Sequence, residues 1–189
     1  MSQDTPKSLR YVEAFLIVGL AIVGILFVKP VFAPKLKPVV SIPGLIECED
    51  LKIKAKSPNV FFQAQSTKDF SQGTWSKNQH MFGLAYGIGD WIELSLPVSA
   101  AGRYRIDAYL TKASDYAIIQ WSLDGSDFGS EIDLWSSTGQ VISSGKIVLG
   151  ETELTPGLHT LRLEVKGKNA GNSSPHYFFG IDGFVLEKI

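Results

Sequence analysis

The sequence predicts one all-β domain that is preceded by a single transmembrane α-helix. Three observations lead to this prediction. An apolar run lies near the N-terminus, short alternating segments fill the chain from residue 45 onward, and turn residues separate these segments. The 189 residues include 18 Gly, 9 Pro and 11% aromatic residues, a composition that favours strands and turns over helices.

Residues 11–29 are predicted to form the transmembrane helix, after a short polar tail of residues 1–10. Tyr11–Val28 is apolar apart from one glutamate, and as a helix it would be about 27 Å long, close to the ~30 Å of a hydrocarbon core. A cleaved signal peptide is the alternative, because Val31-Phe32-Ala33 resembles a cleavage site. Pro34 follows directly and disfavours cleavage. Basic residues flank both ends of the run, so the positive-inside rule assigns no orientation.

A proline-rich linker is predicted to follow over residues 30–44. Four prolines in this stretch prevent a helix and favour an extended spacer. The folded domain is therefore expected to span residues 45–189.

Three segments of this domain alternate between apolar and polar residues, as half-buried strands do. They lie at residues 91–98, 103–110 and 161–166. Ser66–Gly89 is expected to be a long loop, of the kind that often carries function. Further strand candidates are Leu45–Lys54, Val60–Gln65, Tyr116–Leu123, Glu131–Leu134, Lys146–Leu149 and Phe178–Glu187.

Three motifs of the domain resemble a known family. They are Ile46-Glu47-Cys48-Glu49-Asp50, Gly89-Asp90-Trp91-Ile92-Glu93-Leu94 with the later Ala101-Gly102-Arg103-Tyr104, and Gly180-Ile181-Asp182-Gly183. Together they resemble the galactose-binding-like β-sandwiches of carbohydrate-binding modules, over about residues 45–189. The resemblance implies a jelly-roll β-sandwich. It implies less about function, because this fold hosts many roles.

The same resemblance implies a structural Ca²⁺ site. The positions that match the family's calcium ligands are Glu47, Glu49 and Asp182, and carboxylate oxygens are ligands that Ca²⁺ prefers. A bound ion would hold the two ends of the domain together. The alternative is that these acids pair with Lys or Arg, or are solvated.

Aromatic platforms with a few polar groups bind sugars in such modules. Strand parity places Trp121 in the core and Trp91 outward or under a loop. Trp75, in the long loop, and Trp135, at a strand end, are the candidate surface residues. For Trp75 three interpretations stay open: a sugar platform, a cap on the sandwich, and a protein contact. Candidate polar companions are His80, Asp115, Tyr116, Asn172, His176 and Tyr177.

The sequence argues against two classes of function, nucleic-acid binding and catalysis. The formal net charge is −1, so the basic excess typical of nucleic-acid binding is missing and no such partner is expected. No nucleophile elbow, P-loop, zinc-protease or dinucleotide motif occurs, so we expect no enzyme. The lone Cys48 is expected to be a small buried residue rather than a catalytic thiol.

Two hypotheses for the function remain. The first is an accessory or structural subunit of a larger membrane protein complex, whose helix packs in the lipid bilayer with other integral membrane proteins while the sandwich packs on the exported face. The alternative is a membrane-anchored carbohydrate-binding module that recognises envelope or extracellular glycan. Both place a single-pass protein in the inner (cell) membrane, with its C-terminal domain periplasmic or extracellular.

Overall fold

The computed structural model describes residues 40–70 and 73–189. The chain divides into two units, residues 1–35 and 36–189, and the described residues all belong to the second. The polar tail, the transmembrane helix and most of the linker lie outside the described residues, so these elements stay predictions. In the part that the structure describes, no helix is long and apolar enough to cross a membrane.

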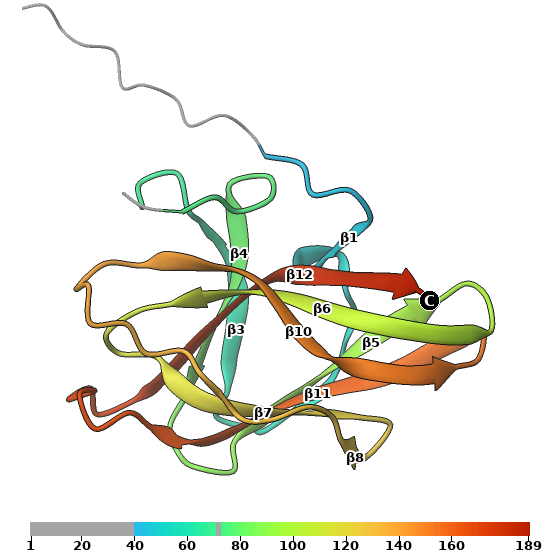
Figure 1. The fold of residues 1–189 in the computed structure, drawn as a ribbon. Helices are drawn as coiled ribbons and strands as arrows, with labels where there is room; N and C mark the ends of the chain where they lie inside the picture. The colour runs from blue at the N-terminus through green and yellow to red at the C-terminus, as the bar shows by residue number, and fades with distance from the viewer. Residues whose placement is uncertain (1–39, 71–72) are drawn as a thin grey trace, which may run out of the picture. The chain divides into compact units, whose positions relative to one another are not determined.

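Two antiparallel sheets form a β-sandwich (Figure 1). The first sheet has the order β10-β6-β12-β4-β3, with β1 paired to β12, and the second has the order β2-β5-β11-β7-β8, with β9 paired to β7. The strands of the first sheet are β1 (Leu45–Glu47), β3 (Phe61–Ser66), β4 (Gln79–Ala85), β6 (Gly102–Lys112), β10 (Ile142–Leu154) and β12 (Tyr177–Lys188). Those of the second are β2 (Ile53–Lys56), β5 (Trp91–Val98), β7 (Ala117–Leu123), β8 (Ser126–Asp127), β9 (Ile132–Asp133) and β11 (Gly157–Lys168). The prediction of an all-β domain is confirmed.

The core lies between the two sheets, where the alternating segments place their apolar residues. Leu94 of β5 pairs with Leu161 of β11, and Ile92 pairs with Leu163. All four side chains are fully buried. Trp121 of β7 is also fully buried, as its strand parity predicts.

The prediction that Leu45–Lys54 forms one continuous strand is wrong. The chain leaves β1, forms the short 3₁₀ helix η1 (Cys48–Asp50) and then enters β2 in the other sheet. The apolar pattern of this stretch arises because it crosses from one sheet to the other. Cys48 is buried at this crossing, as expected.

The predicted loop Ser66–Gly89 is wrong in its length, because it contains β4. The loop between β3 and β4 covers only residues 67–78, of which 71–72 lie outside the described residues. β4 has apolar or buried residues on both faces: Met81 packs in the core, while on the opposite side His80 is fully buried and Phe82 and Leu84 are half-buried. A strand with apolar residues on both faces lacks the alternation by which the other strands are found.

Candidate functional site

Four loops meet at one end of the sandwich, which we name the loop end. They connect β4 to β5 (residues 86–90), β6 to β7 (113–116), β9 to β10 (134–141) and β11 to β12 (169–176). Direct contacts join each of these loops to at least one other, so the loop end is one surface built from distant parts of the sequence.

Asn172 is the main connection between two of the loops. Its side-chain N–H donates to the Tyr116 carbonyl at 2.9 Å, and its Oδ1 accepts from the Ser174 N–H at 2.9 Å. Nearby, the Asn169 amide donates to Asp133 Oδ2 at 2.6 Å. These side chains use their polar atoms to hold the loops in place.

Trp135 lies between two loops and is half-buried. Its backbone bridges to Ala113, while its ring packs over Gly171. A Cβ atom at Gly171 would lie 2.5 Å from Trp135 Cζ2, so only glycine permits this ring position. The indole Nε1 is buried and has no hydrogen-bond partner among the described residues.

Four aromatic rings follow one another from the loop end onto the outer face of the first sheet, and we name them the aromatic row. The Tyr86 and His176 ring centroids are 4.9 Å apart, those of His176 and Phe178 are 6.3 Å apart, and those of Phe178 and Phe82 are 5.7 Å apart. Tyr86 is 54% exposed, and the other three are half-buried. The row therefore offers partly accessible ring surface.

Two further charged groups lie at the loop end: Asp115 in the β6–β7 loop, and Lys168, the last residue of β11. The Asp115 carboxyl is half-buried, and this burial raises its pKa above the ordinary value. It makes no hydrogen bond or ion pair to another residue in the described ranges. The Lys168 ammonium lies 4.4 Å from the centroid of the Tyr177 ring and donates to the Ser174 carbonyl. Asp115 is thus the charged group that is left for a ligand.

The structure brings six of the eight predicted ligand residues to the loop end. Two of the six are buried and serve the loops themselves: the Tyr116 residue is 3% exposed, and the Asn172 side chain uses both its nitrogen and its oxygen in hydrogen bonds within the loops. Whether any of the six binds a ligand stays a prediction. The six are Asp115, Tyr116, Trp135, Asn172, His176 and Tyr177.

Trp75 and His80 lie elsewhere, and their predicted exposure is wrong. Trp75 is 2% exposed and His80 is fully buried, because the loop of residues 67–78 folds back onto the outer face of the first sheet. The Trp75 indole N–H donates to Thr111 Oγ1 at 2.8 Å, and the His80 ring nitrogens contact Thr111 Oγ1 at 2.7 Å and Gln65 Oε1 at 2.8 Å. Trp75 therefore caps the sheet, one of the three interpretations that its position left open.

Tyr86 is the residue that sequence reasoning missed. It directly follows β4 and begins the tight loop Tyr86–Asp90, where Asp90 Oδ2 accepts the backbone N–H groups of Tyr86 and Gly87, each at 2.9 Å. An aromatic residue in a Gly-rich turn, Tyr-Gly-Ile-Gly-Asp, was the available signal. It was overlooked because β4 itself was not recognised.

A second site lies where the two ends of the domain meet. Ser76 connects two predicted calcium ligands: its N–H donates to both Asp182 carboxylate oxygens at 3.1 Å, and its hydroxyl donates to Glu47 Oε1 at 2.6 Å. Both Glu49 carboxylate oxygens and Glu47 Oε2 are buried without a hydrogen-bond partner among the described residues. We name Glu47, Glu49 and Asp182 the carboxylate cluster.

Burial and repulsion from neighbouring carboxylates raise the pKa of two acids of this cluster, Glu49 and Asp182. Loss of solvation is the main cause for both Glu49 and Asp182, and the neighbouring carboxylates add to it, so each pKa rises to about 7. Lys77 only partly neutralises the cluster, since its exposed ammonium lies 3.7 Å from Glu47 Oε1 and 3.2 Å from Asp50 Oδ2. Unpaired buried carboxylate oxygens of this kind fit a hard cation.

The carboxylate cluster fits a cation in the chemistry of its oxygen donors, but the donors are not arranged as a complete coordination shell. In the described ranges, no group of three His, Cys, Asp or Glu side chains is already arranged to hold a metal ion. The carboxylate cluster supplies suitable oxygen donors, and these side chains would have to rearrange when an ion binds.

Known structures share the sandwich, although no protein-family model and no curated protein matches the sequence. A Paenibacillus xanthan lyase is 25% identical with a TM-score of 0.65, and the match covers 81% of this chain and 14% of that one. A Paenibacillus cycloisomaltooligosaccharide glucanotransferase, complexed with cycloisomaltoheptaose, is 17% identical with a TM-score of 0.50, covering 80% and 19%. A β-1,3-glucan-binding CBM6 from Bacillus halodurans is 19% identical with a TM-score of 0.45, covering 76% and 94%.

The chain thus spans less than a fifth of the length of the two enzymes. What it shares with them is one β-sandwich domain, and their activities belong to far longer chains.

Proposed function

We propose that the β-sandwich is a non-catalytic carbohydrate-binding domain and that it holds its glycan at the loop end. The observation that carries this proposal is the exposed Tyr86 at the head of the aromatic row, on the same surface as the unpaired Asp115 carboxyl. Binding sites for small polar molecules combine apolar or aromatic surface with a few placed polar groups.

The chemical groups of a sugar are complementary to those of the loop end. A sugar ring presents C–H groups on its face, which pack on an aromatic ring, and hydroxyl groups on its rim. The Asp115 carboxylate accepts hydrogen bonds from hydroxyl groups, and the His176 imidazole both donates and accepts. Trp135, fixed over Gly171, adds a second aromatic surface.

The acids of the loop end favour binding over hydrolysis. Glycoside hydrolysis normally requires a pair of carboxyl groups, one on each side of the scissile bond. Besides Asp115, two other acids lie at the loop end. Asp90, in the β4–β5 loop, holds the turn after β4 through its Oδ2. Asp133, at the end of β9, accepts from the Trp135 N–H and the Asn169 amide with its two oxygens. Both are occupied with structural hydrogen bonds.

The comparisons add support from the fold. Both enzymes that share the sandwich are named for carbohydrate substrates, and each contains it as a small part of a long chain. The described residues do not test the first hypothesis, a subunit of a membrane complex; we prefer glycan binding because of the exposed Tyr86 and the Asp115 carboxyl at the loop end. If the helix of residues 11–29 forms as the sequence predicts, it would hold the domain at a membrane surface.

We also propose that the carboxylate cluster binds a structural Ca²⁺. Glu47, Glu49 and Asp182 would supply its oxygen ligands, and the ion would supply the positive charge that these buried acids lack. Ser76 would keep the Glu47 and Asp182 side chains turned toward each other through its two hydrogen-bonding groups. This role joins the first strands to the last and contributes to stability only.

Glycan binding is tested with the full chain in a detergent that has no sugar headgroup, applied to an array of plant, fungal and bacterial polysaccharides. The best hit is then titrated against variants. We expect Tyr86→Ala to weaken binding roughly thirtyfold, because a central aromatic contact contributes about 2 kcal/mol. Leu158→Ala is the matched control, since Leu158 is 72% exposed on β11, outside the four loops.

Two results would contradict the proposal. One is an array without any hit, and the other is a hit whose affinity is equal in the wild type and in Tyr86→Ala.

A further inference from the structure

β3 is an edge strand of the first sheet and lacks the usual protection against pairing with another strand. Its residues, Phe61–Ser66, include no charge and no proline. It pairs with β4 over six residues without a register shift. In the described ranges, no backbone hydrogen bond outside the β3–β4 ladder involves this strand.

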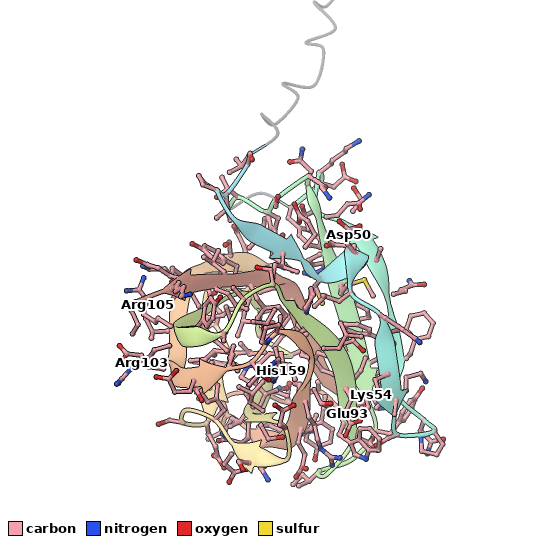
Figure 2. The ribbon with its side chains drawn as sticks, turned by 90° about the vertical axis from the view of Figure 1, so that its right-hand side faces the viewer. Asp50, Lys54, Glu93, Arg103, Arg105 and His159 are labelled. Atoms are coloured by element: carbon pink, nitrogen blue, oxygen red, sulfur yellow. The ribbon has the colours of Figure 1, made fainter. Side chains whose placement is uncertain are left out.

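The other edge strands among the described residues are protected. β1 and β9, which each pair with one neighbour only, have three and two residues. β10, at the opposite edge of the same sheet, has two register shifts and carries Glu151 in an ion pair with Arg103. β2 has a register shift and carries two lysines. One of them, Lys54, lies near Glu93, and in Figure 2 both lie on the opposite side of the domain from Arg103. β8 has only two residues. Bulges, charges and short length are the devices by which proteins prevent edge pairing, and β3 has none of them.

The side chains of β3 divide between the two faces of the sheet. Phe62 points inward and stacks on the core residue Phe179, with ring centroids 5.9 Å apart. Phe61, Gln63 and Gln65 therefore share the outer face. Phe61 is 47% exposed and Gln63 is exposed, while Gln65 is held by His80. The open edge is bordered by an exposed apolar ring and a neutral amide.

We propose that two copies of this chain pair through β3, antiparallel, about a two-fold axis at Gln63. In this register Gln63 lies opposite the partner's Gln63, and Phe61 lies opposite the partner's Gln65. The two first sheets would then form one continuous sheet across the dimer. The inference rests on β3 alone and is independent of what the loop end binds.

The strand is complementary to itself, which is why a second copy is the occupant that we choose. A side-chain amide carries both donors and an acceptor, so two glutamines that face each other satisfy one another. No like charges meet, because the strand has none. A two-fold pairing centred on a residue keeps the outer-face side chains of both copies on one side, whereas a slip by one residue would reverse them.

The experiment measures the mass of the full chain by sedimentation equilibrium in a density-matched detergent. The variants are Gln63→Lys and Gln63→Glu, studied separately and as an equimolar mixture. Val148→Lys is the matched control, because Val148 is 54% exposed on β10 at the protected edge of the same sheet. Circular dichroism melts confirm that each variant is folded.

We expect the wild type and Val148→Lys to be dimers. Each charge variant alone should form a dimer with roughly tenfold weaker affinity than the wild type, because like charges then face each other across the axis. The mixture should recover the dimer, because Lys faces Glu.

Three outcomes would overturn the proposal. They are a monomeric wild type, a dimer that neither charge at position 63 weakens, and charge variants that stay monomeric when mixed. A dimer formed through any other surface, the predicted transmembrane helix included, gives the second outcome.

Discussion

Lowering the pH should destabilise the domain through His80, which lies in a directional hydrogen-bond chain. The Trp75 indole donates to Thr111 Oγ1, whose own hydrogen is left to donate to His80 Nδ1, and the His80 Nε2–H donates to Gln65 Oε1. A proton on Nδ1 would face the Thr111 hydroxyl hydrogen. Thr111 is fully buried, so no water replaces the lost partner.

The size of the effect follows from the histidine pKa. Burial lowers the pKa of His80 from 6.5 to about 4. The folded state therefore resists a proton that the unfolded state takes up below pH 6.5. The stabilisation is fully present above pH 6.5 and is lost as the pH falls toward 4. Linkage gives a loss of about 2 kcal/mol by pH 5 and of about 3 kcal/mol at still lower pH.

The assay is urea unfolding of the full chain between pH 7.5 and pH 4.5, followed by tryptophan fluorescence, for the wild type and for His80→Gln. Glutamine cannot titrate in this range. Glu49 and Asp182 titrate in the same range with the opposite sign, because acids with raised pKa values gain protons in the folded state. The difference between the two proteins removes that contribution. Parallel curves for the two proteins would refute the assignment of the pH dependence to His80.

Three further predictions concern glycines and the cluster. Gly171→Ala should displace Trp135 and weaken glycan binding severalfold, whereas Gly167→Ala, whose Cβ would have no neighbour within 4 Å, should not; equal titrations of the two variants would argue against a role for Trp135. Gly83→Ala places a Cβ against the buried Phe179 ring and should destabilise the domain by about 1–3 kcal/mol in thermal melts, with Gly167→Ala again as the control. Removal of Ca²⁺ by a chelator should lower the melting temperature at pH 8 more than at pH 6, because the ion requires ionised carboxylates and two of the cluster have a pKa of about 7; a melting temperature indifferent to Ca²⁺ at pH 8 would count against the calcium proposal.

Strands with one buried and one exposed face were predictable from the sequence. β5, β6 and β11 are found where apolar and polar residues alternate, and the inward residues are those that the pattern indicates. β4 and β10 were not predictable to the same degree. β4 has apolar residues on both faces, and the two register shifts of β10 interrupt its period of two.

The candidate site was predictable only in part. Trp135 was assigned outward from strand parity and is half-exposed. Trp75 lies in a loop, where parity does not apply. It is buried against residues that include His80 and Thr111, the latter 36 residues away. Tyr86 packs against His176, which comes from a loop far away in the sequence, and no local pattern indicates this contact.

The sequence alone determined the all-β character, the core faces of the regular strands and the formal net charge of −1. The local sequence pattern suffices for these features, because each depends on composition or on residues that are close together along the chain. Only the tertiary structure decided which loops meet, that three acids from opposite ends of the domain share one buried place, and that β3 is the unprotected edge. Each of these depends on segments that the sequence places far apart and that only strand pairing brings together.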